Sequence, residues 1–280
     1  MYNMKLIADS GSTKTDWALL QGGEVLLRVR TEGLNPNTTS SEKCNEIIAH
    51  AIELMAHASD VKHIYFYGAG CAGEAQKKQM TAVLNGLFPQ AATEVASDLY
   101  GAVYAVASPG EACVTGILGT GANSCYFDGT TITGDDFSLG FILGDEGSGS
   151  WLGKQLLSSC WYGEMPEKLQ EAFTRQFSIS RNAILQGLYQ GGSASAYLAS
   201  FAAFAVEHRA HPYIRNMIDT GFSLFISRYL NRFSGTKTVH MIGGIACALE
   251  EEFRQNALRY QWQPGVFLKE PITGLIEKLK

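Results

Sequence analysis

The sequence predicts an α/β protein made of two similar halves with a cleft between them. Residues 6–20 form two apolar runs around a turn of small hydroxyl residues near Gly11, a pattern typical of a β-hairpin. A second strand–turn–strand pattern begins roughly 110 residues later, at 112–127, again with glycines and hydroxyls in its turn. Strands and helices alternate after each hairpin. A repeated unit indicates internal duplication, and a ligand is expected in the cleft between the halves.

Hydrophobic periodicity predicts the remaining elements. In the first half we expect strands at 24–29, 63–67 and 93–96 and helices at 41–58, 74–87 and 99–107. In the second half we expect four or five amphipathic helices within about 150–232, a strand at 237–242, a helix at 245–258, a short strand at 267–268 and a terminal helix from Pro271. Aromatic residues of the helical stretch, including Trp161 and Tyr162, are expected in the core.

Composition places the chain among ordinary globular proteins. It has 280 residues, of which 46% are hydrophobic and 18% charged. The formal charge of −5 argues against nucleic acid or an anionic membrane as the main partner. No apolar run approaches the roughly 18 residues that a membrane helix needs, and the first residues show no signal-peptide pattern. Six scattered cysteines without a Cys-x-x-Cys pair indicate reduced thiols, so we expect a cytoplasmic protein.

The first hairpin turn carries the groups that a phosphate site needs. Backbone N–H groups, hydroxyls, one ammonium and two flanking carboxylates suit phosphate oxygens and a hydrated divalent cation. The turn is not a Walker A loop, because Thr13 stands before Lys14 where that loop has glycine. Asp9 is the candidate Mg²⁺ ligand, with a turn-capping role as the alternative. The candidate phosphate-binding residues are Ser10, Gly11, Ser12, Thr13 and Lys14.

Four stretches, in order, resemble the sugar kinase/Hsp70/actin superfamily. Residues 9–16 resemble its first phosphate loop, 118–124 its second, and 241–246 its adenosine loop. Asp98, before a helix of small residues, stands where that fold keeps its catalytic acid. The Gly-Asp-Glu-Gly-Ser motif at 144–148, together with Gly-Thr-Gly-Ala-Asn-Ser, is similar to the N-acetylglucosamine kinase branch, grouped with BadF/BadG/BcrA/BcrD-type ATPases.

The resemblance implies two ribonuclease-H-like, actin-like ATPase domains with a nucleotide cleft between them. It covers residues 8 to about 153 and 239–249. The first domain would span 1–108 and the second 109–280, with a helical insertion at about 150–232. The terminal helix could pack back on the first domain.

The resemblance also implies residue roles. Asp98 would be the catalytic base for a sugar hydroxyl, although an aspartate there also suits a helix N-cap. The nucleotide would further contact Gly119, Thr120, Gly121, Gly243 and Gly244. Residues 138–140 replace a stretch that carries an aromatic beside the sugar in animal members, which leaves the exact sugar open. The implied sugar-binding residues are Asn37, Thr120, Asn123, Ser138, Leu139, Gly140 and Asp145.

The implied function is ATP-dependent phosphorylation of an amino sugar on its 6-hydroxyl, with Mg²⁺ and N-acetylglucosamine as the first candidate acceptor, in a homodimer. One alternative is an ATPase activator of a dehydratase or reductase, which would hold an iron–sulfur cluster between subunits. Another is a catalytically silent sugar sensor. The glycine loop at 68–73 matches a dinucleotide fingerprint, but it follows three strands and a helix, whereas that fold has it after its first strand.

Overall fold

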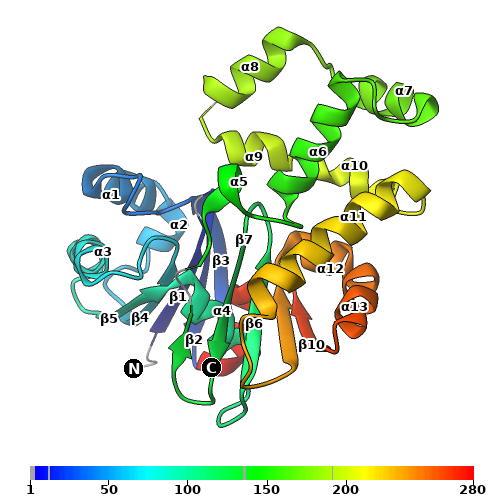
Figure 1. The fold of residues 1–280 in the computed structure, drawn as a ribbon. Helices are drawn as coiled ribbons and strands as arrows, with labels where there is room; N and C mark the ends of the chain where they lie inside the picture. Colours follow the sequence, from blue (N-terminus) through cyan, green and yellow to red (C-terminus); the bar gives the residue numbers. More distant parts are fainter. Residues whose placement is uncertain (1–3, 12, 135–136, 191) are drawn as a thin grey trace. The chain divides into compact units, whose positions relative to one another are not determined.

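The computed structural model describes residues 4–11, 13–134, 137–190 and 192–280. The chain divides into two compact units (Figure 1). Unit 1 comprises Met1–Val106 and Glu270–Lys280, and unit 2 comprises Ala107–Lys269. The chain therefore leaves unit 1 once and returns to it for its last helix.

Unit 1 is built on a five-stranded mixed sheet in the order β3-β2-β1-β4-β5. Strands β1, β2 and β3 form an antiparallel meander, and β4 and β5 run parallel to β1. The bounds of these strands are β1 Met4–Ser10, β2 Lys14–Gln21, β3 Glu24–Glu32, β4 Val61–Gly68 and β5 Ala92–Ser97.

Unit 2 repeats this topology in the order β10-β9-β6-β7-β8. An antiparallel meander again comes first, and β9 and β10 then run parallel to β6. The predicted α/β class and the duplicated strand–turn–strand are therefore confirmed. The strands are β6 Cys113–Leu118, β7 Ala122–Phe127, β8 Ile132–Thr133, β9 Thr238–Ile242 and β10 Gln263–Leu268.

The helices of unit 1 cover its sheet and include the chain's last helix, α14 Pro271–Leu279. The prediction of one helix over 41–58 is wrong, because the backbone leaves helical geometry at Ala51 (φ −77°, ψ 71°). Just before the break, the His50 ring nitrogen Nδ1 lies 2.6 Å from the Glu46 carbonyl oxygen, so a side chain competes for a helical acceptor. The other helices are α1 Ser41–Ala49, α2 Ile52–Met55, α3 Glu74–Leu87 and α4 Asp98–Val106.

Helix α14 packs tightly against α4 within unit 1. Its buried residues Ile272, Leu275, Ile276 and Leu279 complete the packing there. At Gly274 an added Cβ would lie 2.5 Å from the Ala105 carbonyl oxygen, so the two helices approach closely at this glycine.

The helical stretch of unit 2 has more segments than the four or five predicted. The predicted single helix at 245–258 is also two helices, because the buried Leu249 leaves helical geometry (φ −120°, ψ 34°). The helices are α5 Gly140–Leu143, α6 Gly149–Trp161, α7 Glu167–Gln176, α8 Arg181–Tyr189, α9 Ala194–Ala199, α10 Ala202–Glu207, α11 Pro212–Phe225, the π-helical turn η1 Ile226–Leu230, α12 Gly244–Ala248 and α13 Glu250–Arg259.

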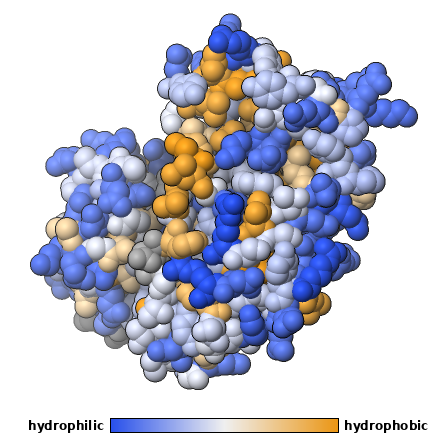
Figure 2. All heavy atoms as spheres, viewed as in Figure 1, coloured by the Kyte–Doolittle hydropathy of each residue, from blue (hydrophilic) through white to orange (hydrophobic). Residues whose placement is uncertain are grey.

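Each unit has its own apolar core. Trp17 and Phe66 are fully buried in unit 1, and Phe222 and Phe225 in unit 2. The core placement expected for Trp161 and Tyr162 is wrong: these side chains are 46% and 73% exposed, because α6 ends there at the surface. Figure 2 shows apolar surface over the helices of unit 2, where the exposed apolar residues include Leu139, Ile142, Leu143, Trp161, Tyr162 and Tyr189.

Candidate functional site

Predicted site residues of unit 1 gather where its parallel strands end. Ser10 of β1 is in register with Gly68 of β4, which is in register with Ser97 of β5. Asp9, the glycine loop and Asp98 therefore lie at one edge of the sheet. The carboxyl edge of parallel strands is the usual place for a ligand site in α/β proteins.

Asp9 lies in an environment that disfavours a lone negative charge. Burial, together with the nearby charges of Asp16 and Asp98, raises its pKa to about 7. Lys14 and the Ile272 backbone N–H act in the opposite direction. Carboxylates that repel one another in this way favour a bound cation, since its charge would relieve the repulsion.

Asp98 begins α4, and burial raises its pKa. Its Oδ1 accepts a hydrogen bond from the Leu99 N–H at 3.0 Å, which partly opposes this shift. The side chain of Ser97, the residue before α4, also caps the helix, because its Oγ accepts from the Tyr100 N–H at 3.2 Å. Both side chains therefore bond to N–H groups in the first turn of α4, and Asp98 also stands at the sheet edge as a partly desolvated acid.

Lys14 is held by carboxylates within unit 1. Its Nζ lies 2.9 Å from both Asp16 Oδ2 and Glu270 Oε1. Arg30 binds the same two acids, with Nε 2.6 Å from Asp16 Oδ1 and Nη2 3.0 Å from Glu270 Oε1. Sequence analysis missed Glu270, because a partner 256 residues from Lys14 leaves no local pattern.

The Ser10 hydroxyl serves the hairpin itself. Its Oγ is fully buried, lies 2.7 Å from Thr15 Oγ1 and accepts from the Leu34 N–H at 3.1 Å. This hydroxyl therefore joins the hairpin to the following loop within the interior of unit 1.

The rest of the hairpin turn is more accessible. The Gly11 N–H donates to the Lys14 carbonyl at 2.9 Å and closes the turn, while the Thr13 side chain is exposed. Ser12, the remaining candidate, lies outside the described residues.

Asn37 lies against the glycine loop. Its Oδ1 accepts from Gln76 Nε2 at 3.1 Å, and its backbone N–H donates to Asn35 Oδ1 at 3.0 Å. At Gly70 (φ +80°) an added Cβ would meet both asparagine side chains, the nearer atom at 2.2 Å. Cys71 in this loop is buried, and burial raises its pKa to about 12, which disfavours the thiolate form at neutral pH.

The glycine loops of unit 2 also meet at one sheet edge. Strands β6 and β9 are parallel, with Ile117 opposite Ile242. Gly243 adopts a φ of +118°, and a Cβ there would lie 2.3 Å from the Leu118 carbonyl oxygen. The loop after β9 thus reaches the loop of Gly119, Thr120 and Gly121 by a backbone approach that only glycine permits.

The start of α6 holds this loop from the other side. The backbone N–H groups of Gly149 and Ser150 donate to the carbonyls of Gly119 and Thr120 at 2.8 and 2.9 Å. The carbonyl groups of Gly119 and Thr120 are therefore hydrogen-bonded to the start of α6, whereas Thr120 is exposed to solvent.

Asp145 is buried beside this loop with a left-handed backbone, φ +61°. Its Oδ1 accepts from the Ala122 N–H at 2.9 Å and from Ser138 Oγ at 3.3 Å. A Cβ at Gly121 would lie 2.8 Å from Asp145 Oδ2. Burial raises the Asp145 pKa, while these two hydrogen bonds lower it. Three predicted residues, Gly121, Ser138 and Asp145, therefore lie together in one cluster.

The other predicted sugar residues lie on the same stretches. Asn123 Oδ1 accepts from the Ser124 N–H at 2.9 Å. The Gly140 N–H lies 3.4 Å from Ser138 Oγ, and the Leu139 side chain is 69% exposed. Sequence analysis missed Tyr229 and Arg228, which contact Asp145 and Glu146.

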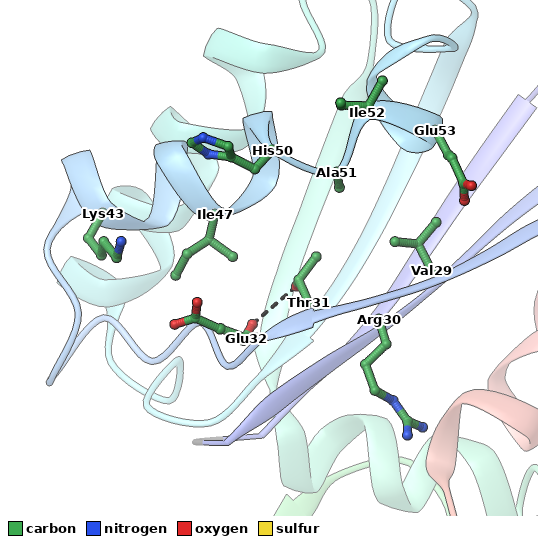
Figure 3. A pocket seen from close by; sticks show the side chains of 10 residues that line it. All are labelled: Val29, Arg30, Thr31, Glu32, Lys43, Ile47, His50, Ala51, Ile52 and Glu53. Atoms are coloured by element: carbon green, nitrogen blue, oxygen red, sulfur yellow. Dashed lines mark hydrogen bonds between the residues drawn. The ribbon is translucent and has the colours of Figure 1, made fainter. Parts of the chain in front are cut away.

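Two hollows lie away from these residues. One, of about 480 Å³, lies between β3 and the α1–α2 segment of unit 1; Figure 3 shows the side chains of Arg30, Glu32 and Lys43 among those around it. The other, of about 590 Å³, is lined mainly by apolar side chains of α5, α6, α8 and α9, together with Lys154, Ser158 and Arg181. Neither includes a predicted site residue.

Two further observations concern ligands and membranes. Across the described ranges, no group of three or more His, Cys, Asp or Glu side chains forms a metal-binding cluster. None of the helices in the same ranges has the length and apolar character to cross a bilayer.

Solved structures match this chain over nearly its whole length. A "putative N-acetylglucosamine kinase" from Porphyromonas gingivalis is 34% identical, with a TM-score of 0.91, and the match covers 98% of this chain and 97% of that one. A protein of the same description from Chromobacterium violaceum is 18% identical (TM-score 0.66, 99% of both chains). A ROK family glucokinase from Streptomyces griseus, in complex with glucose and AMPPNP, shares the fold at 13% identity (TM-score 0.59, 99% and 98%). No protein-family model and no curated protein matches the sequence.

Proposed function

Since the chain belongs to the N-acetylglucosamine kinase family of sugar kinases, we propose that it transfers the γ-phosphoryl group of ATP to the 6-hydroxyl of an amino sugar. N-acetylglucosamine is the first candidate acceptor, because the 34% identical relative carries it in its name. The observation that carries the proposal is the meeting of Asp9 and Asp98 at the carboxyl edge of the unit 1 sheet, beside the first phosphate hairpin.

Asp98 is the proposed catalytic base. Its carboxylate would accept the proton of the 6-hydroxyl as the sugar oxygen bonds to the γ-phosphorus and the bond to the ADP oxygen breaks. Phosphoryl transfer needs positioning and charge neutralisation more than covalent help from the protein. A raised pKa suits this role, because it makes the carboxylate a stronger base than an exposed aspartate.

Asp9 is the proposed magnesium ligand. Bound there through water, Mg²⁺ would neutralise charge on the transferred phosphoryl group. The Lys14 ammonium group lies beside the hairpin, but the carboxylates of Asp16 and Glu270 already offset its charge. We therefore assign Lys14 to orienting the turn more than to supplying net charge.

Most of the proposed nucleotide contacts would be made by backbone groups. Gly11 and the exposed Thr13 belong to the first hairpin, together with Ser12. The second set is Gly119, Thr120 and Gly121, with Gly243 and Gly244 for the adenosine. The Ser10 hydroxyl is occupied inside unit 1 and supports the hairpin.

On the sugar side, Asp145 is the proposed principal contact. Its carboxylate is partly desolvated and hydrogen-bonded, which fixes its direction. We assign Asn37, Thr120, Asn123, Ser138, Leu139 and Gly140 to the same ligand. A homodimer and a cytoplasmic location belong to the proposal as well, the first on the family resemblance and the second on the scattered reduced cysteines.

No described feature favours the ATPase activator. An iron–sulfur cluster shared between subunits needs exposed cysteines, and Cys125, close to the second phosphate loop, is fully buried. A catalytically silent sugar sensor would have the same proposed binding residues and would differ only in that it does not transfer phosphate to the sugar.

The test is coupled ADP release with Mg·ATP and a panel of sugars. The panel contains N-acetylglucosamine, glucosamine, N-acetylmannosamine, an N-acetylmuramic sugar, glucose and a sugar-free control. We expect sugar-dependent ADP release with the highest kcat/KM for N-acetylglucosamine, and a 6-phosphate product by NMR. Asp98→Asn should lower kcat by about 10²–10⁴-fold and leave ATP affinity nearly unchanged.

Other results would contradict parts of the proposal. ADP release that needs no sugar would favour the activator, and sugar binding without ADP release would favour the sensor. Near-normal turnover in Asp98→Asn would remove that residue from the mechanism.

A further inference from the structure

The loop that carries Asp145 is held by a π-helical turn. Turn η1 continues α11, and its Asn231 N–H donates to the Ile226 carbonyl at 2.9 Å, five residues back. A π turn rotates the side chains that follow it relative to an α-helix, and such turns are frequent at functional sites. Two consecutive residues of this turn, Arg228 and Tyr229, contact Glu146 and Asp145.

Tyr229 is fixed at both ends. Its hydroxyl accepts from the Asp145 backbone N–H at 3.0 Å and bonds to the Glu146 carboxylate. Its backbone carbonyl accepts from Ser124 Oγ at 2.8 Å. Its ring, 2% exposed, stacks on Phe225 with a centroid distance of 5.0 Å and an interplanar angle of 17°. The hydroxyl therefore has little freedom to leave the loop.

The loop needs such support because its backbone is strained. A left-handed φ at a non-glycine residue costs free energy and persists only when its surroundings hold it. The Tyr229 hydroxyl binds the N–H of Asp145, and the Ala122 N–H binds its carboxylate. Gly144, the residue before Asp145, leaves room for this hydroxyl, because an added Cβ there would lie 2.9 Å from the Tyr229 hydroxyl oxygen.

Arg228 holds the next residue of the loop. Its Nη1 forms an ion pair with Glu146 Oε1. The Glu146 side chain is 7% exposed, whereas that of Arg228 is 53% exposed. Removing the guanidinium would leave the buried Glu146 carboxylate without its ion-pair partner, which would destabilise this part of the loop.

We propose that Tyr229 and Arg228 are positioning residues for the acceptor sugar, because they hold the Gly144–Asp145 peptide and the Glu146 side chain and so aim the Asp145 carboxylate. The inference rests on the proposed function, in which Asp145 contacts the amino sugar. In this proposal neither residue contacts the sugar itself. Their effect should therefore appear in acceptor binding and not in the binding of nucleotide.

The first test is Tyr229→Phe, which removes only the hydroxyl. The matched control is Tyr126→Phe, a residue of the same unit whose ring likewise stacks on a phenylalanine, Phe233. We expect Tyr229→Phe to raise KM for the sugar about three- to tenfold, the net worth of one hydrogen bond, with KM for ATP unchanged. Arg228→Lys should retain more sugar affinity than Arg228→Gln.

The second test needs no activity. Hydrogen exchange of the amides at 144–149 should be about threefold or more faster in Tyr229→Phe than in Tyr126→Phe. If the wild type phosphorylates no sugar, the proposed function fails, and the exchange comparison alone then decides whether Tyr229 holds the loop. Unchanged exchange overturns the inference. In an active enzyme, unchanged sugar KM or an equal rise of both KM values also overturns it.

Discussion

At the residue scale, the two acids of unit 1 differ in how they should respond to magnesium. Both have a raised pKa, mainly through burial. Mg²⁺ competes with a proton for a carboxylate that it binds. Magnesium should therefore lower the pKa of Asp9, the proposed ligand, while Asp98 keeps a raised pKa to act as a base.

This difference between Asp9 and Asp98 predicts which of the two acids sets the fall in activity at low pH, the acid limb of the pH profile. With saturating Mg·ATP, kcat/KM for the sugar should fall about tenfold per pH unit below the pKa of Asp98. Because burial favours the protonated form, the limb should lie above 3.8, the ordinary aspartate value. Its midpoint should not move with the Mg²⁺ concentration. A midpoint that falls as Mg²⁺ rises would assign the limb to Asp9.

Some residues of the proposed chemistry stand out in the sequence and others do not. Asp9, Asp98 and Asp145 stand in motifs, so a local pattern suffices to find them. Tyr229 lies 84 residues from Asp145 along the chain. Its helical surroundings predicted only a core aromatic, because periodicity shows which face is buried and not which backbone group a hydroxyl will meet.

At the element scale, the contact between α14 and α4 depends on one glycine. We expect Gly274→Ala to lower the free energy of unfolding by about 1–3 kcal/mol, since its methyl group would collide with the Ala105 backbone. Urea denaturation followed by circular dichroism measures the change.

Gly86→Ala in α3 is the matched control. No atom lies within 4 Å of its added Cβ, so alanine should raise stability by about 0.5–1 kcal/mol through helix propensity. Equal effects of the two substitutions would show that the helix contact at Gly274 is not tight.

Helix ends were harder to predict than helices. The breaks at Ala51 and Leu249 carry no glycine or proline, and both stretches keep helical periodicity across the break. Leu249 leaves helical geometry with its side chain fully buried. A break that tertiary packing sets leaves no mark in a local pattern.

At the scale of the whole molecule, duplication explains why the fold class was predictable. Each unit opens with an antiparallel meander and then adds two parallel strands, so the same pattern appears twice in the sequence. The likeness to solved sugar kinases confirms this two-domain fold. The return of Glu270–Lys280 to unit 1 could be expected only from the family resemblance, because it depends on side-chain contacts with residues far away in the sequence.

That return predicts how the two units depend on the chain's end. Removing residues 270–280 deletes four buried apolar side chains, each worth about 1.5–3 kcal/mol when fully buried. Together they approach the whole stability of a domain, about 5–15 kcal/mol. The deletion also leaves Lys14 and Arg30 without Glu270. We expect hydrogen exchange to show lost protection in β1, β2 and β4.

Unit 2 should keep its protection in β6, β7 and β9, because its core cluster contains no residue of the deleted segment. Deleting the exposed Lys280 alone is the control and should change neither unit. Equal loss in both units would mean that they unfold together. Retained protection in unit 1 would contradict this prediction, because it would mean that the sheet and the remaining helices are stable without α14.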